Sequence, residues 1–410
     1  MKNTLKKNLG IFVFFMLFGG FSPFSYGSDR EVNFVALSDM TGPASIIAKP
    51  GIQGVKDYLR YVNERGGVDG VQIKLIEVDT RFDMARMVSG YAKYRKTKRL
   101  MAVLVASTAG AKLLRPKAIK DRLILHVPPA GKFQAKPAYL FLWGPPYADT
   151  FSEAMNWALE DWKQKGHEDS PTFGHISWGN DGGRGHLRGA REYAMKMGFK
   201  LLKPVYFPVG DLIDAGHLLG LRKADYIYMG GITEPAPTNI ILNGHKMGIR
   251  YPKTTFISDY YAPFWNVDLK IHTKELQGWV ATAFYLRGTE VVNHPFIKLL
   301  WTRYHNEPIS EMMPFYLLGV SLGMTFEAGV KVAFKTRGYD AIDSDALNQA
   351  YQKLTGKDIF QGICGKCAFS PTSRCASNEV KFYQVKGSDL VPITGWRETP
   401  DAVSLYKWDK

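Results

Sequence analysis

The fold is decided by residues 32–78, which read VNFVALSDMTGPASIIAKPGIQGVKDYLRYVNERGGVDGVQIKLIEV. The opening run Val32–Leu37 is short, and every residue in it except Asn33 is apolar, which is typical of a buried parallel strand. Apolar residues then recur at helical spacing over 51–63, and Gly66 follows as a stop signal. The alternating stretch Gln72–Val78 reads as a second strand. This order predicts a parallel strand pair with a right-handed crossover.

The same alternation of strands and helices continues along the chain. It pauses near residues 139–146 and then restarts as a second α/β unit. The sequence therefore predicts an α/β fold of two doubly wound parallel-sheet lobes, joined by a multi-strand hinge, with a ligand between them. The expected divisions are a signal peptide (1–27), lobe 1 (28–148), lobe 2 (149–277), a return to lobe 1 (278–357), and a return to lobe 2 with a cysteine-containing hairpin and tail (358–410).

The first residues have the three parts of a cleavable secretory signal. Three lysines precede the apolar run Ile11–Phe18, and a small, polar stretch ends at Gly27. That run is shorter than the ~20 residues that cross a bilayer, which argues against a membrane anchor. No cysteine stands at the cleavage site to carry a lipid, and no later stretch reads as membrane-spanning. We expect a soluble protein released into the periplasm.

The formal net charge of +15 falls to +12 when residues 1–27 are removed, because they hold three lysines and no acid. An excess of basic over acidic residues can indicate that the protein binds nucleic acid, an anionic membrane surface or an acidic ligand. The basic residues are scattered, apart from the cluster over 93–99, and no nucleic-acid motif accompanies them. Nucleic acid is therefore not an expected partner.

Several short pieces, in order and at matching spacing, resemble one known family. They are Asp39–Pro43, Gly51–Val55, Val62–Gly70, Glu77–Thr80, Ala106–Gly110 and Asn180–Gly185. Across the mature chain they resemble the leucine/isoleucine/valine-type solute-binding proteins of ABC importers, with the type I periplasmic binding protein fold. The resemblance implies a non-catalytic, monomeric receptor. It would capture a small molecule, an amino acid or another small carboxylate, and deliver it to an ABC-type permease.

In lobe 1 the resemblance implies a carboxylate site. Ser107 and Thr108 follow a strand and precede a helix, where hydroxyls and free backbone N–H groups favour an anion. Ala130, Gly131 and Lys132 follow the next strand and would face the same cleft. The alternative for Ser107 and Thr108 is a helix N-cap alone, and the two roles can coexist.

In lobe 2 the sequence departs from the amino-acid binders. Gly182 stands where the family has a cleft tyrosine, and Ile232 where it has an aromatic residue. The acid that would neutralise an α-ammonium group corresponds to Asp259, or else Tyr260 takes that position. An amino acid and an amine-free carboxylate thus both remain candidate ligands. Other side chains that would suit a carboxylate ligand are Trp143, Tyr147, Arg184 and Tyr261.

Three cysteines, Cys364, Cys367 and Cys375, lie outside the family's pattern. Because an exported protein meets an oxidising compartment, we expect one disulfide, pairing Cys375 with Cys364 or Cys367 and leaving one thiol over. A redox-active Cys364–Cys367 bond is an alternative. A zinc site is a further alternative, although it needs more ligands than three cysteines.

No catalytic motif is present. The sequence holds no G-x-S-x-G, no phosphate-binding loop and no H-E-x-x-H, and the nine histidines are dispersed. We therefore expect no enzyme, cofactor or metal. Two alternatives to a transport receptor are a ligand sensor that signals to a membrane receptor or kinase, and a periplasmic redox protein using Cys364 and Cys367.

Overall fold

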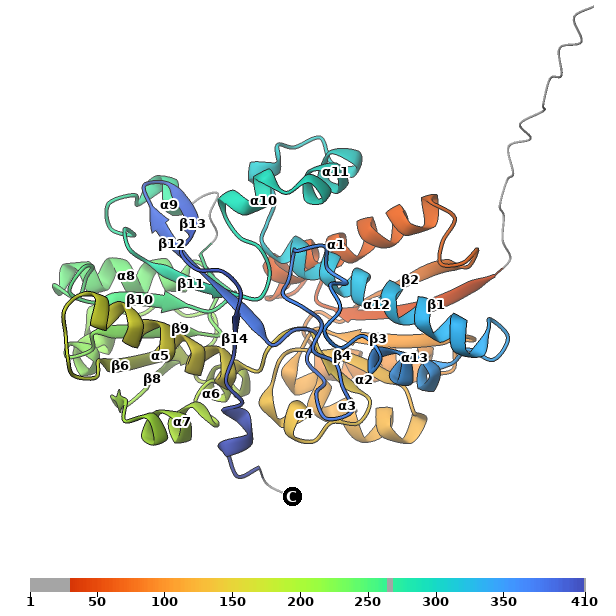
Figure 1. Ribbon diagram of the computed structural model, residues 1–410, viewed down its shortest axis with the longest axis horizontal. Coiled ribbons are helices and arrows are strands. Elements are labelled where there is room, and N and C mark those ends of the chain that lie inside the picture. Colours follow the sequence, from red (N-terminus) through yellow and green to blue (C-terminus); the bar gives the residue numbers. More distant parts are fainter. Residues whose placement is uncertain (1–29, 264–267, 409–410) are drawn as a thin grey trace, which may run out of the picture.

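The computed structural model describes residues 30–263 and 268–408 as two α/β lobes that lie side by side (Figure 1). This confirms the predicted fold class. The proposed signal segment, residues 1–27, lies outside the described residues.

Lobe 1 contains a five-stranded parallel sheet in the order β2-β1-β3-β4-β5. Every residue of β1 after Glu31 is buried, because helices cover both faces of the sheet. Its odd-numbered side chains Val35 and Leu37 pack with α2 and α3, and its even-numbered ones with α1 and α12. The elements are β1 (Glu31–Ser38), α1 (Ser45–Glu64), β2 (Gln72–Asp79), α2 (Met84–Tyr94), β3 (Leu100–Val105), α3 (Thr108–Asp121), β4 (Ile124–Val127), α4 (Gly131–Ala135), β5 (Leu140–Leu142), α11 (Pro295–Tyr304), η2 (Ile309–Glu311), α12 (Phe315–Arg337) and α13 (Ser344–Tyr351).

Lobe 2 contains a nine-stranded mixed sheet in the order β13-β12-β11-β10-β9-β6-β7, with β8 beside β6 and β14 beside β12. Strands β6 to β11 pair in parallel, as predicted, whereas β12 to β14 pair antiparallel. The elements are α5 (Tyr147–Gln164), β6 (Thr172–Trp178), α6 (Asp181–Gly185), α7 (Ala190–Met197), β7 (Lys200–Leu201), β8 (Val205–Phe207), η1 (Ala215–Leu221), β9 (Tyr226–Gly230), α8 (Ala236–Lys246), β10 (Thr255–Ser258), α9 (Asp268–Ile271), β11 (Val280–Ala283), α10 (Thr289–Asn293), β12 (Glu379–Lys386), β13 (Asp389–Pro392), β14 (Arg397–Glu398) and η3 (Val403–Leu405).

The chain passes between the lobes after β5, after β11 and before β12. Strand β11 lies within the range 278–357 that was expected to return to lobe 1, yet it pairs with β10 and β12 in the lobe 2 sheet. The crossing therefore follows Ala283. Before β12, the backbone of Cys375 forms a β-bridge with that of Leu142 at the end of β5. The segment after residue 358 therefore first follows the edge of the lobe 1 sheet.

Helix α12 is long and apolar enough to span a membrane by length and composition, contrary to the expectation that no stretch after the signal would be. Most of it is buried inside lobe 1, against α1. Two glycines allow the close contact. A Cβ on Gly319 would lie 1.8 Å from the Gly51 carbonyl oxygen, and one on Gly54 would lie 2.0 Å from the Tyr316 carbonyl oxygen. The helix is thus a core element of lobe 1.

The three cysteines are free, buried thiols, and the structure shows no disulfide among them. Their backbones pair in three different places, Cys364 with Tyr285, Cys367 with Ser377 and Cys375 with Leu142. The expected disulfide is therefore absent, and the hairpin of this region is β12–β13 rather than a cysteine-stapled loop. Burial raises the pKa of the Cys367 thiol to about 11. It raises the pKa values of the other two thiols further, which disfavours the reactive thiolate.

Candidate functional site: a cavity between the lobes

The two loops that end β3 and β4 bring the lobe 1 residues of the predicted site together. Ser107 begins α3 as its N-cap, and its hydroxyl accepts a hydrogen bond from the Gly110 backbone N–H at 3.1 Å. Ser107 is buried behind this cap, whereas Thr108 is half-exposed on the first turn. The carboxyl ends of β3 and β4 thus place Thr108 beside α4, where open α/β sheets commonly bind ligands.

A cavity of about 130 Å³ lies between the lobes, where α3 and α6 are in contact. A dry cavity of about 150 Å³ can hold benzene, so this cavity has room for a compact solute of about that size. Its walls come from both lobes and from the C-terminal segment. They are Thr108, Lys112, Ala130, Gly131, Lys132 and Phe133 from lobe 1, Asp181, Gly185 and Arg188 from lobe 2, and Tyr406 and Trp408 from the C-terminal segment.

The charges on the cavity wall are predominantly positive. Arg188 is balanced by Asp181, with Nη2 2.7 Å from Oδ1. Within the part of the chain that the structure describes, no ion pair involves Lys112 or Lys132. Lys112, which is exposed, and Lys132, which is half-buried, therefore line the cavity without a carboxylate partner. An anion placed there would gain electrostatic stabilisation from both.

Behind the cavity lies a cluster of buried tyrosines. The Tyr147 and Tyr261 hydroxyls are 3.3 Å apart, and the Tyr260 and Tyr261 rings stack with their centroids 4.3 Å apart. Burial raises the pKa of all three phenols, so they are neutral hydrogen-bonding groups. A Cβ on Gly185, a cavity residue, would lie 3.3 Å from the Tyr147 ring, so this cluster adjoins the cavity wall.

Asp259, the candidate partner for a ligand ammonium group, is already bound by its own lobe. Its Oδ2 atom lies 2.9 Å from Nε2 of His186 and accepts a hydrogen bond from the Gly231 N–H at 2.7 Å. Its Oδ1 atom accepts a hydrogen bond from the Tyr261 N–H at 3.1 Å. The other ring nitrogen of His186 lies 3.3 Å from the Gly183 carbonyl oxygen. Both carboxylate oxygens of Asp259 are therefore occupied by contacts within lobe 2.

The structure thus brings together only part of the predicted site. Thr108, Ala130, Gly131 and Lys132 line the cavity, and Gly182 lies on α6 beside them. Asp259, Tyr260 and Ile232 are buried within lobe 2 and are not among the cavity-lining residues. Arg184 does not line the cavity either, since its guanidinium lies over the Tyr206 ring.

Seven lining residues were not predicted from the sequence: Lys112, Phe133, Asp181, Gly185, Arg188, Tyr406 and Trp408. A signal was available for Lys112, which follows Thr108 by one helical turn on α3 and so shares its face. No local pattern pointed to Tyr406 or Trp408. No group of three or more histidine, cysteine or acidic side chains could hold a metal among the described residues.

Comparison with known families shows to which family the chain belongs. The periplasmic binding protein family matches residues 31–389, nearly the whole described chain. The chain belongs to this family. The match confirms the resemblance seen in the sequence, and it makes the periplasmic binding protein described here a solute receptor. No curated protein matches the chain closely enough to count as a relative.

Solved structures share the fold of this periplasmic binding protein at low sequence identity. A branched-chain amino acid ABC transporter protein from Thermus thermophilus with bound valine is 17% identical, with 91% of this chain and 98% of that chain covered and a TM-score of 0.77. A fatty acid ABC transporter substrate-binding protein from Thermomonospora curvata is 16% identical (92% and 95% covered, TM-score 0.74). A solute-binding protein from R. palustris in complex with 4-hydroxybenzoate is 14% identical (91% and 98% covered, TM-score 0.72).

Proposed function

We propose that this protein is a periplasmic receptor for a small carboxylate that lacks an α-ammonium group, and that it delivers this solute to an ABC-type permease. The observation that carries the proposal is the pairing of charges around the cavity. Lys112 and Lys132 line it without an acidic partner, whereas Asp259 is buried in lobe 2, away from the cavity wall. The site therefore has free positive charge for a carboxylate and no free negative charge for an amine.

The carboxylate would lie at the start of α3. The Thr108 hydroxyl and the backbone N–H groups of this first turn are hydrogen-bond donors, and the helix dipole adds positive potential. The ammonium group of Lys112, one turn further along, and that of Lys132 on α4 would complete the site. A charged pair near the protein surface contributes up to about 4 kcal/mol at 4 Å before screening and desolvation.

An α-ammonium group would find little compensation in the same cavity. The one acidic side chain on the wall, Asp181, is already paired with Arg188. Placing an unpaired ammonium group beside Lys112 and Lys132 would add repulsion between like charges. The amino-acid ligand that the sequence left open is therefore the less favourable choice.

The similar structures are consistent with a carboxylate that lacks an amine, because they show that one fold serves different solutes. The Thermus thermophilus protein holds valine, the Thermomonospora curvata protein is named for fatty acids, and the R. palustris protein holds 4-hydroxybenzoate. Fatty acids and 4-hydroxybenzoate are carboxylates without an amine. The lobes would close on the solute, and a permease would recognise the closed form. We further propose that the protein acts in the periplasm as a soluble monomer, without catalysis, after removal of residues 1–27.

A thermal-shift screen tests the proposal. The panel would hold aromatic and aliphatic carboxylates, branched-chain and polar amino acids, amides and urea. Ligand at about a hundred times its dissociation constant adds roughly 2.7 kcal/mol of stability. We expect amine-free carboxylates to raise the midpoint of the wild-type protein.

Two variants locate the binding site. Lys112→Ala should lose most of the carboxylate-induced shift, whereas Lys120→Ala, an exposed lysine of the same helix, should keep it. A shift with amino acids but not with amine-free carboxylates would contradict the proposal, as would an undiminished shift in the Lys112 variant.

A further inference from the structure

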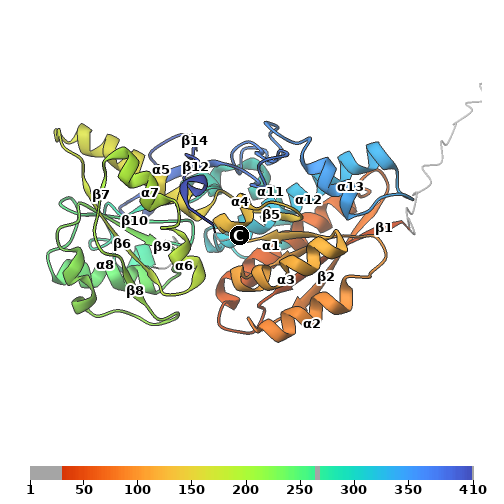
Figure 2. The same ribbon diagram turned by 90° about the horizontal axis from the view of Figure 1, so that it is seen from below.

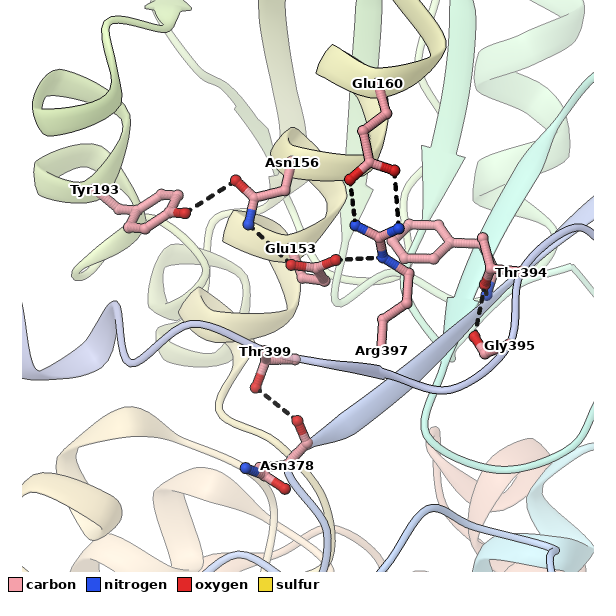
Figure 3. Close-up of polar contacts among 10 residues, drawn as sticks. Glu153, Asn156, Glu160, Tyr193, Asn378, Thr394, Gly395, Arg397 and Thr399 are labelled. Carbon is pink, nitrogen blue, oxygen red and sulfur yellow. Dashed lines mark hydrogen bonds and ion pairs between the residues drawn. The ribbon is translucent and has the colours of Figure 1, made fainter.

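The C-terminal strap, residues 397–408, is held along one face of α5. Arg397 donates hydrogen bonds to Glu153 at 2.5 Å and to both carboxylate oxygens of Glu160 at 2.7 and 2.9 Å (Figure 3). Further along the strap, the Val403 N–H donates to Asp149 at 2.8 Å. Asp149, Glu153 and Glu160 are four and seven residues apart, so they share one face of the helix. The strap is therefore an anchored element of the fold.

Beyond α5 the strap touches both lobes. A Cβ on Gly131 of lobe 1 would lie 2.3 Å from Cγ2 of Val403 and 2.9 Å from the Trp408 ring. A Cβ on Gly189 of lobe 2 would lie 2.3 Å from the Ala402 carbonyl oxygen. Only glycine leaves room for the strap at either place. Both views show it passing between the lobes, with α4 on one side and α7 on the other (Figures 1 and 2).

At its end the strap presents two aromatic rings to the cavity. Trp408 Nε1 donates to the Val403 carbonyl oxygen at 2.9 Å, which fixes the indole against η3. The Tyr406 and Trp408 rings meet edge to face, with their centroids 4.8 Å apart. Both side chains are half-buried, and both line the same cavity as Lys112 and Lys132. The cavity thus combines a cationic side with an aromatic side.

We propose that the strap forms a third wall of the ligand site, with Tyr406 and Trp408 contacting the apolar, planar part of a solute whose carboxylate is held by Lys112 and Lys132. The proposal rests on the carboxylate-receptor function and narrows it to aromatic acids. Ligand sites commonly combine an apolar, aromatic lining with a few charged groups that fix orientation. Paired aromatic rings also gain from their preferred edge and stacked geometries, beyond the area they bury.

A purely structural role for the strap makes a different prediction. If Tyr406 and Trp408 only cover lobe 1, then removing their rings lowers thermal stability and leaves the affinity for every solute unchanged. If they form a wall of the site, affinity falls, and it falls most for solutes with a ring. Leu405 provides the matched control, since it directly precedes Tyr406 in the strap and 38% of it is exposed.

Calorimetric titration with benzoate and propionate as probes distinguishes the two roles. We expect Trp408→Ala and Tyr406→Ala each to weaken benzoate binding about tenfold and to change propionate binding less than twofold. Leu405→Ala should bind benzoate as the wild-type protein does. Gly131→Ala, which displaces the strap without removing a ring, should also weaken benzoate binding. Thermal midpoints recorded for each variant would show that it is folded.

Unchanged benzoate affinity in both aromatic variants would overturn the strap proposal and leave the carboxylate function standing. If the wild-type protein binds amino acids instead of carboxylates, the function fails, and phenylalanine replaces benzoate as the probe. Weakening by Trp408→Ala would then still support the strap as a wall, and no weakening would overturn it. A wild-type protein that binds no solute of the panel would overturn both proposals.

Discussion

The Asp259 carboxylate lies 2.9 Å from the ring Nε2 of His186, and both side chains are almost completely excluded from solvent. An exposed pair with the same separation, His217 and Asp214, occurs in the same lobe. The two pairs therefore have the same separation and opposite burial.

His186→Ala should lower the free energy of unfolding by about 3 kcal/mol, because it leaves an oxygen of the buried Asp259 without its partner. His217→Ala should lower it by less than about 1 kcal/mol, as exposed ion pairs do. Urea unfolding of both variants at neutral pH provides the measurement. Equal losses in the two variants would show that the buried contact between His186 and Asp259 adds no more stability than the exposed one.

The contact between α1 and α12 predicts opposite effects for two glycines of one helix. Gly54→Ala should destabilise the protein by about 1–3 kcal/mol, since its Cβ would overlap the Tyr316 carbonyl oxygen. At Gly51 a Cβ would meet the nearest atom at an ordinary 3.7 Å. Gly51→Ala should therefore be neutral, or stabilising by about 0.5–1 kcal/mol through helix propensity. Thermal unfolding of both variants would show the difference, and a tolerated Gly54→Ala would refute the close contact.

The three cysteines should behave as shielded free thiols. Burial raises the pKa values of all three, so the folded protein should react very slowly with a thiol reagent at pH 8, and all three thiols should react once it is denatured. Alkylation under denaturing conditions without reductant, followed by mass spectrometry, counts them. A single modified cysteine would instead indicate the disulfide that the sequence suggested.

Acid should destabilise the protein below about pH 6.5 through its buried neutral histidines. Burial lowers the pKa of His126 to about 3, and burial also lowers the pKa of His175. The unfolded chain therefore binds more protons between these folded values and about 6.5, so stability is fully present above that pH and is lost as the pH falls.

His126→Gln retains a group that can bond the Tyr351 hydroxyl, 2.9 Å from the native ring, but it does not titrate. We expect this variant to be less stable at pH 7.5 and to lose less stability between pH 6.5 and 4, by up to about 1.4 kcal/mol per pH unit. His217→Gln, at an exposed position, is the control. Identical slopes in the wild-type protein and the His126 variant would contradict this account.

Local signals in the sequence predicted most elements of the fold. The apolar spacing over residues 84–94 predicts a helix that coincides with α2, and Asp83 caps it by accepting a hydrogen bond from the Arg86 N–H. Ser107 likewise marks the start of α3. The sequence from His186 to Met197 also predicts one helix, but α7 begins only at Ala190, since Gly189 has a φ of 109° and interrupts it. Such an interruption is set by the Ala402 backbone packed against Gly189, which no local pattern shows.

The site could be predicted only where it lies on one loop and the helix that follows. Thr108 and Lys132 each follow a strand of lobe 1, so parallel-sheet geometry brings them to one edge. The pairing of His186 with Asp259 joins residues 73 positions apart, and it changes which ligand charge the site can bind. Tyr406 and Trp408 reach the cavity only because the strap is anchored on α5. Contacts of this range leave no periodicity in the sequence.

The central claim is that the cavity binds a carboxylate and rejects an α-ammonium group. Calorimetric titration with 4-methylpentanoate and leucine, which differ by that one group, tests it most directly. The account predicts that 4-methylpentanoate binds at least tenfold more tightly than leucine, and that Lys132→Ala weakens its binding. Tighter binding of leucine would contradict the account, because it would require a free acidic partner in the cavity.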